Sequence, residues 1–172
     1  MSYEICEKPA PVLEQCKAYN GEGCGFHISD GAKGTYRGCE AYGNKLPGFE
    51  VKVNAEPVLE QCKAYDGEQG GFYIHDGGKG TYRGCDAYWN NFAGFEVNKA
   101  EPVLEQCKAY NSINGGGFYI YNGSKGTYRG CEAYGNKFSG FEVLEDCDCT
   151  FTDCKSGTSS FSKTTGGTGF KL

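Results

Sequence analysis

Apolar side chains recur along this 172-residue chain at a fixed spacing instead of following a helical period. An aromatic column and an aliphatic column both keep a spacing of 23 residues, and seven cysteines recur at intervals of 22 to 24 residues. The columns are Tyr3, Phe26, Phe49, Phe72, Phe95, Phe118 and Phe141; Ile5, Ile28, Val51, Ile74, Val97, Ile120 and Val143; and Cys16, Cys39, Cys62, Cys85, Cys107, Cys131 and Cys154. Such a period is typical of a solenoid, in which each repeat buries its apolar side against its neighbours.

Alternation within one repeat, residues 33–51, predicts three short strands. Arg37 and Glu40 face water, whereas Tyr36, Cys39 and Ala41 face inward. Glycines between these stretches predict turns, and no stretch shows the 3.6-residue period of a helix. We therefore expect an all-β solenoid of about seven coils of about 23 residues, in which each strand pairs in parallel with its equivalent in the next coil.

The repeats predict one domain over residues 1–155. Residues 156–172 are rich in Ser, Thr and Gly and are expected to form a C-terminal loop or tail. This tail ends in a candidate last strand, because residues 169–172 resemble residues 140–143. Open strand edges at the two ends of a solenoid favour further pairing, so end-to-end self-association is one expectation.

Outward positions follow a longer period of 46 residues. Three columns alternate in charge from coil to coil, and a fourth alternates acids with neutral or aromatic side chains. They are Glu14, Arg37, Glu60, Arg83, Glu105 and Arg129; Lys17, Glu40, Lys63, Asp86, Lys108, Glu132 and Lys155; Lys33, Glu56, Lys79, Glu101, Lys125 and Asp148; and Glu4, His27, Glu50, Tyr73, Glu96, Tyr119 and Glu142. Opposite charges on adjacent strands attract, and a slip of one coil would pair like charges, so we expect the columns to fix the register.

Composition limits the function further. A net charge of −5 opposes nucleic-acid binding, and no run of about 18 apolar residues predicts a transmembrane segment. No apolar segment follows Met1, so we expect an intracellular protein, soluble or peripheral, and cytoplasmic unless a cleaved presequence is missing.

The eleven cysteines are expected to be mainly free and buried, because their number is odd and seven follow the repeat. Coils about 4.8 Å apart leave oxidation between neighbouring thiols open as an alternative. Cys147, Cys149 and Cys154 lie close in sequence, but neither a CxxC pair nor a histidine accompanies them. We predict no metal site and no cofactor.

The stretches GKGTYRGCDAYWNNFAGFEV (78–97) and SKGTYRGCEAYGNKFSGFEV (124–143) resemble the right-handed parallel β-helix repeat. That repeat occurs in pectate-lyase-like proteins, in carbohydrate-binding and sugar-hydrolase modules and in some F-box proteins, and the resemblance covers residues 3–155. It implies a right-handed coil. The cysteine column stands where the family often stacks asparagine.

The resemblance does not extend to a lyase site, which uses clustered carboxylates to hold calcium. Asp30, Asp76 and Asn122 are two coils apart, too far to share an ion. His75 and Asp76 are adjacent, and we expect them to point to opposite faces of a strand. The sequence therefore predicts no catalytic residues and no enzyme.

The surface feature that remains is an outward stripe of tyrosines with one tryptophan beside it. The stripe consists of Tyr19, Tyr42, Tyr65, Tyr88, Trp89, Tyr110 and Tyr134. Two interpretations stay open: a protein-binding ridge, or rings that cover the turn and shield the core. The expected function is a non-catalytic structural scaffold that docks into a larger protein assembly. A carbohydrate-binding module is the alternative.

Overall fold

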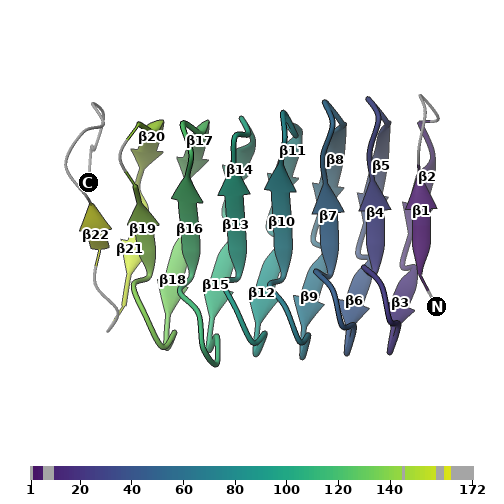
Figure 1. The fold of residues 1–172 in the computed structure, drawn as a ribbon, viewed down its shortest axis with the longest axis horizontal. Coiled ribbons are helices and arrows are strands. Elements are labelled where there is room, and N and C mark those ends of the chain that lie inside the picture. Colours follow the sequence, from purple (N-terminus) through teal and green to yellow (C-terminus); the bar gives the residue numbers. More distant parts are fainter. Residues whose placement is uncertain (1, 6–9, 145, 158–160, 164–172) are drawn as a thin grey trace.

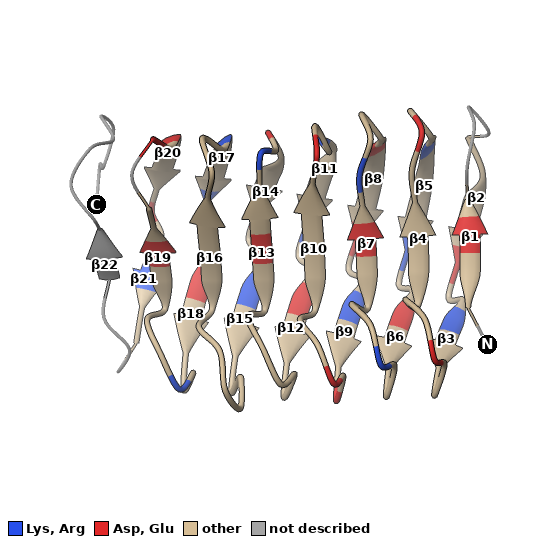
Figure 2. Cartoon of the chain, in the orientation of Figure 1, with Lys and Arg blue, Asp and Glu red and all other residues tan. Residues whose placement is uncertain are grey.

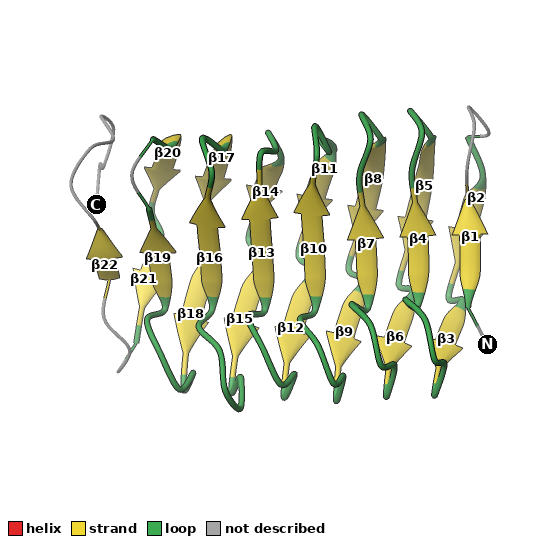
Figure 3. Cartoon of the chain, viewed as in Figure 1, coloured by secondary structure: helices red, strands yellow, loops and turns green. Residues whose placement is uncertain are grey.

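The computed structural model describes residues 2–5, 10–144, 146–157 and 161–163, and these residues form a solenoid of parallel strands (Figure 1). Every repeat contributes one strand to each of three sheets, which run along the length of the molecule. Strands and loops account for the whole of the described chain, without a helix (Figure 3). The predicted all-β solenoid of parallel strands is confirmed.

The strands of the three sheets follow in the order of the coils. Sheet A contains β1 (Tyr3–Ile5), β4 (Phe26–Ile28), β7 (Phe49–Val51), β10 (Phe72–His75), β13 (Phe95–Asn98), β16 (Phe118–Tyr121), β19 (Phe141–Val143) and β22 (Phe161–Lys163). Sheet B contains β2 (Val12–Glu14), β5 (Lys33–Arg37), β8 (Glu56–Glu60), β11 (Thr81–Arg83), β14 (Val103–Glu105), β17 (Lys125–Arg129) and β20 (Asp148–Thr152). Sheet C contains β3 (Lys17–Tyr19), β6 (Glu40–Tyr42), β9 (Lys63–Tyr65), β12 (Asp86–Tyr88), β15 (Lys108–Tyr110), β18 (Glu132–Tyr134) and β21 (Lys155–Ser156).

The core is built from the aromatic and aliphatic columns of sheet A. Rings from Phe26 to Phe141 stack in a continuous row, with centroids 4.6 to 4.9 Å apart and planes within 6° of parallel. In every second coil a buried tyrosine of sheet B meets this row edge-on, as Tyr82 does on Phe72 at 6.4 Å. Because the strands pair in register, identical side chains lie directly above one another, and the predicted columns are the packing unit.

The cysteine column occupies the corner between sheets B and C. Cys39, Cys62, Cys85, Cys107 and Cys131 are buried, and all ten cysteines in the described residues are free. Each buried thiol of the column donates to a backbone carbonyl of the preceding coil; Cys62 Sγ, for example, lies 3.3 Å from the oxygen of Tyr36. The expectation of free, buried thiols is confirmed, and the thiol takes the hydrogen-bonding place that an amide would have.

Asparagines instead fill the corner between sheets C and A, in every second coil. Asn44 Nδ2 donates to the Ala18 carbonyl at 3.1 Å, and Asn44 Oδ1 accepts from the Gly21 amide at 3.0 Å. Asn90 and Asn136 repeat this arrangement. The 46-residue period therefore also exists in the interior, where a large amide alternates with a small residue.

The charge columns lie as predicted on adjacent strands. In sheet B, Arg37 contacts both neighbouring glutamates, Glu14 at 3.2 Å and Glu60 at 2.8 Å, and Arg83 likewise contacts Glu60 and Glu105. Lysine and acid alternate along sheet C from β3 to β21 (Figure 2). Each exposed pair contributes little alone, but the alternation favours a single register.

Sheet A continues into the predicted tail. Strand β22 pairs in parallel with β19, and Phe141 aligns with the backbone of Phe161. The candidate last strand at residues 169–172 lies outside the described residues.

Candidate functional site

The tyrosine stripe forms a regular stack on sheet C. Successive rings from Tyr19 to Tyr134 have centroids 4.9 to 5.2 Å apart and are tilted by at most 10°. Tyr19 and Tyr134, at its ends, are exposed and the four rings between them are half-buried. Trp89 contacts Tyr88 edge-on at 5.3 Å and is 50% exposed.

Stacking decides which part of each ring a ligand could reach. Neighbouring tyrosines cover one another's faces, so the solvent meets ring edges and hydroxyl groups. One of these hydroxyls is itself engaged, because Tyr65 donates to Glu40 at 3.1 Å. The stripe therefore resembles a stabilised surface more than a row of open aromatic platforms.

Exposed apolar side chains gather beside the stripe. Of the nine exposed large apolar residues in the described chain, seven lie on sheet C or in the loops from sheet C to sheet A. These seven are Tyr19, Leu46, Trp89, Phe92, Ile113, Tyr134 and Phe138, and we call them the C–A corner. Phe92 and Phe138 flank a depression of about 360 Å³ that has Gly115 and Gly116 between them and Glu96 and Glu142 at its rim.

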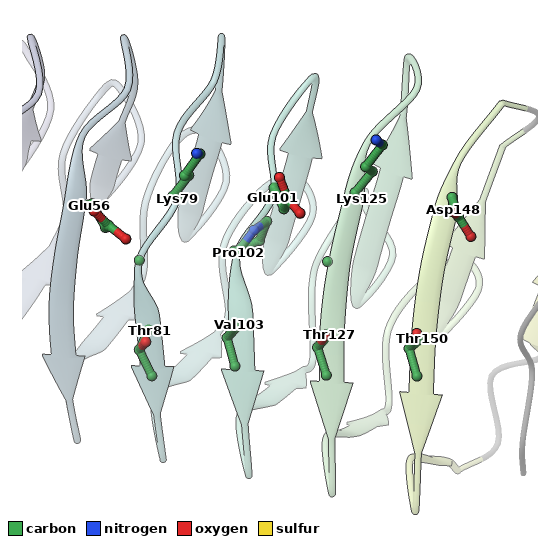
Figure 4. A pocket seen from close by; sticks show the side chains of 12 residues that line it. Glu56, Lys79, Thr81, Glu101, Pro102, Val103, Lys125, Thr127, Asp148 and Thr150 are labelled. Atoms are coloured by element: carbon green, nitrogen blue, oxygen red, sulfur yellow. The ribbon is translucent and has the colours of Figure 1, made fainter.

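A second depression, of about 500 Å³, follows the start of the sheet B strands (Figure 4). Glu56, Lys79, Glu101, Lys125 and Asp148 form one side of it. A column of Thr81, Val103, Thr127 and Thr150 forms the other side. The alternating charges neutralise one another, so this groove has no excess of positive charge to hold an acidic polysaccharide.

Within the described residues, thiol, imidazole, ammonium and carboxylate groups gather around Glu50, on the outer face of sheet A. Cys24 Sγ lies 3.4 Å and His27 Nδ1 lies 3.3 Å from Glu50 Oε2. His75 Nε2 lies 3.0 Å from the other carboxylate oxygen, and Lys52 Nζ lies 3.6 Å from Oε2. We call these five residues, together with Asp76, the Glu50 cluster; it includes both histidines of the chain.

Local structure explains how the cluster assembles. His27, Glu50 and His75 stand on β4, β7 and β10, three successive strands of sheet A, whereas Cys24 lies in the loop that enters β4. Lys52 follows directly after β7. Contacts between residues 23 to 26 positions apart in sequence are therefore contacts between neighbouring coils.

Burial and hydrogen bonds act against each other in setting the protonation of the cluster. The hydrogen bond from His75 is the main reason that the pKa of Glu50 falls to about 2, against the opposing effect of burial. Burial, and then the nearby Glu50 charge, raises the pKa of the Cys24 thiol to about 12. Burial alone would lower the pKa of His75, but its bonds to Glu50 and Asp76 outweigh burial and raise it.

The expectation that His75 and Asp76 point apart is wrong. His75 Nδ1 lies 2.9 Å from Asp76 Oδ2, so Asp76, His75 and Glu50 form a continuous chain of hydrogen bonds. Asp76 follows β10 and has a φ of 47°, which ends the alternation of the strand and brings its side chain beside the imidazole.

The sequence contained part of the signal for this cluster. The fourth column places His27 next to Glu50, but it gives no position for Cys24 in a loop or for His75 two residues beyond the column.

Cys147, Cys149 and Cys154 are buried, and among the residues described they do not form a metal-ligand group.

Comparison with known proteins defines the family. A family model described as a right-handed beta helix region matches residues 6–156, so this chain belongs to the right-handed β-helix family. Among curated proteins, none matches the sequence significantly. A search of the described residues for helices long and apolar enough to cross a membrane finds none.

Solved structures support the same fold. A crystal structure of pectate lyase Pel9A superposes with a TM-score of 0.71 at 16% identity, and the match covers 94% of this chain and 51% of that one. This chain thus spans about half the length of that lyase, and the likeness concerns the fold alone. QnrB1, a plasmid-mediated fluoroquinolone resistance protein, aligns over 92% of both chains at 10% identity, but its TM-score of 0.17 carries no argument.

Proposed function

We propose that this chain is a non-catalytic scaffold, a rigid β-solenoid that docks into a larger protein assembly through its C–A corner and tyrosine stripe. The observation that carries the proposal is the concentration of exposed apolar side chains along this one corner. Contiguous apolar surface beside polar faces is typical of a protein interface, and aromatic residues are enriched there.

The rigidity of the surface adds support. The tyrosines are held by stacking, and the loops of the corner are held by buried amides such as Asn44 and Asn90. A surface that is ordered before binding loses little conformational entropy when a partner docks. Free thiols throughout the described chain are typical of a reducing compartment, which supports an intracellular location.

A carbohydrate-binding module is supported less well. Sugars pack against the open faces of aromatic rings, but in the stripe those faces are covered by the next tyrosine. The groove on sheet B lacks exposed aromatic side chains and a positive excess of charge. A protein partner, which can contact ring edges and hydroxyl groups along a flat stripe, fits this geometry better.

The test compares the native assembly of wild-type protein with that of a corner variant. Leu46→Gln, Phe92→Gln and Phe138→Gln combined remove three exposed apolar side chains, and glutamine is the residue already present at the equivalent Gln69. The partner that co-purifies with the wild type under non-dissociating conditions should be held at least about tenfold more weakly by this variant, with an unchanged circular dichroism spectrum.

A matched control changes sheet B instead. Val58→Thr and Val103→Thr introduce the residue that adjacent strands carry in the same column, so retention of the partner should not change. Equal retention by the corner variant and the control would rule out the corner as the docking surface. Selective binding to one oligosaccharide on a glycan array would favour the carbohydrate-binding alternative.

A further inference from the structure

The Glu50 cluster contains a set of donor atoms that the scaffold proposal does not use. Cys24 Sγ, a ring nitrogen of His27 and a Glu50 carboxylate oxygen all lie within 4.8 Å of one another. Cys24 and Glu50 are mostly buried, and His27 is half-buried. A thiol and an imidazole from one coil and a carboxylate from the next converge here, and together they are a ligand set for a transition metal.

The separations suit a tetrahedral ion. Ligand atoms bound at about 2.0–2.3 Å to tetrahedral zinc lie about 3.3–3.7 Å from one another. The Cys24 and His27 donor atoms are 3.4 and 3.3 Å from Glu50 Oε2, so two edges of such a tetrahedron are already formed. The remaining edge joins the Cys24 and His27 donor atoms, which lie within 4.8 Å of each other, and the half-buried imidazole can turn to complete it.

The surroundings of Glu50 also match those of a metal ligand. Its second oxygen accepts from His75 Nε2, and His75 Nδ1 is in turn held by Asp76. Hydrogen bonds of this kind orient a ligating carboxylate and strengthen its hold on a metal. His75 and Asp76 would thus be positioning residues, and one coordination position would remain open to water.

The repeat itself shows that the fold does not require this group. The same site two coils later contains Glu96, and there the Tyr121 hydroxyl donates to the carboxylate at 2.7 Å. The positions of Cys24 and His27 are taken there by Gly70 and Tyr73. A soft ligand and both histidines of the chain have therefore been gathered at one of several structurally equivalent glutamates.

We propose that Cys24, His27 and Glu50 bind one divalent transition-metal ion of the zinc class. Thiolate and imidazole donors favour Zn²⁺, Co²⁺ or Ni²⁺ over Mg²⁺ and Ca²⁺, which prefer oxygen ligands. Binding exchanges the thiol proton of Cys24 for the metal, and this proton leaves to the solvent. Lys52, whose ammonium lies 3.6 Å from Glu50 Oε2, must swing outward when the ion binds.

The test is a titration of the chelator-treated, reduced full chain with Co²⁺. One Co²⁺ per chain should bind, with a thiolate-to-cobalt charge-transfer band, visible absorption typical of tetrahedral Co²⁺, release of one proton and displacement by Zn²⁺. Zn²⁺ should also raise the melting temperature.

Variants supplied by the repeat separate ligation from folding. Cys24→Ser should abolish the charge-transfer band, and Cys24→Ser and His27→Tyr should each weaken binding on the order of 100-fold while the metal-free protein melts normally. His75→Tyr, which copies the residue at Tyr121, should weaken binding about tenfold. Lys52→Asn, which copies Asn98, should strengthen binding because a competing cation is gone.

The matched control is Glu96→Gln, which alters the equivalent carboxylate and should leave Co²⁺ binding unchanged. Absence of saturable binding to the folded wild-type chain would overturn the proposal. Binding that survives in both Cys24→Ser and His27→Tyr would also overturn it, because the metal would then occupy other thiols.

Discussion

Glu50 and Glu96 occupy the same place in two successive copies of the 46-residue unit, yet they have different neighbours. Glu50 is surrounded by cationic, imidazole and thiol groups, whereas Glu96 accepts from a tyrosine hydroxyl at 2.7 Å. Both glutamates lie on sheet A in the same register. The equivalent pairs are Cys24 and Gly70, His27 and Tyr73, Lys52 and Asn98, His75 and Tyr121, and Asp76 and Asn122.

The comparison teaches that the backbone constrains this surface weakly. The strands need inward aromatic and aliphatic side chains in every coil, but an outward glutamate can be satisfied by one hydroxyl or by four other groups. Hydrogen bonding alone therefore does not explain the composition of the Glu50 cluster, and this difference between the copies is what motivates the metal proposal.

The largest expected difference between the copies is the loss in free energy of unfolding when each carboxylate is replaced by a neutral amide. Glu50→Gln should lower the free energy of unfolding by about 2 kcal/mol in the presence of chelator, because His75 and Lys52 lose their counter-charge in a mostly buried site. Glu96→Gln should cost less than about 1 kcal/mol, because the amide oxygen still accepts from Tyr121. Urea unfolding of both variants measures this, and equal costs would contradict the comparison.

The second prediction concerns the tyrosine of the Glu96 copy. Burial, and then the hydrogen bond to Glu96, raises the pKa of Tyr121 well above its ordinary value of 10.0. A raised pKa means that the contribution to stability is complete below about pH 10 and is lost as the pH rises further. Tyr121→Phe should therefore cost about 1 kcal/mol near neutral pH, and the gap from wild type should narrow above about pH 10. A gap that stays constant to alkaline pH in thermal melts would show that the hydrogen bond does not control this titration.

The smallest expected effect compares the interiors of two copies. Tyr36 and Tyr82 are equivalent and fully buried, but the Tyr82 hydroxyl donates to the Lys79 carbonyl at 3.1 Å, whereas that of Tyr36 has no hydrogen-bond partner in the described part of the chain. Tyr82→Phe should cost about 1 kcal/mol, and Tyr36→Phe should be neutral or slightly stabilising, because it removes an unpaired buried hydroxyl. Chemical denaturation of the two variants measures this. A larger loss of unfolding free energy for Tyr36→Phe than for Tyr82→Phe would show that the Tyr36 hydroxyl is the one whose hydrogen bond matters.

The sequence was sufficient for the repeat, and particular residues show why. A strand position that faces the core in one coil must face it in every coil, so the Phe26 to Phe141 column could be identified from spacing alone. The same reasoning placed Arg37 between Glu14 and Glu60, since equivalent positions on paired parallel strands are neighbours by construction.

The spacing of residues could not place side chains that lie outside the strands. Cys24 lies in a loop, and Asp76 stands in a turn with positive φ, so neither follows the in-and-out alternation of a strand. The sequence likewise did not show whether the ring faces of the tyrosine stripe are exposed, because a column of outward rings can either lie open or stack. The structure shows stacking, with neighbouring rings tilted by at most 10°.

By itself, the sequence determined the period, the inward and outward positions, the buried thiols and the alternation of charge, because each of these features recurs at a fixed spacing in the sequence. Only the tertiary structure decided that Cys24, both histidines and Asp76 converge around Glu50, and that the tyrosines cover one another's faces. These outcomes depend on loop conformations and side-chain rotamers, which bring atoms of neighbouring coils together. The spacing of residues in the sequence does not specify either of them.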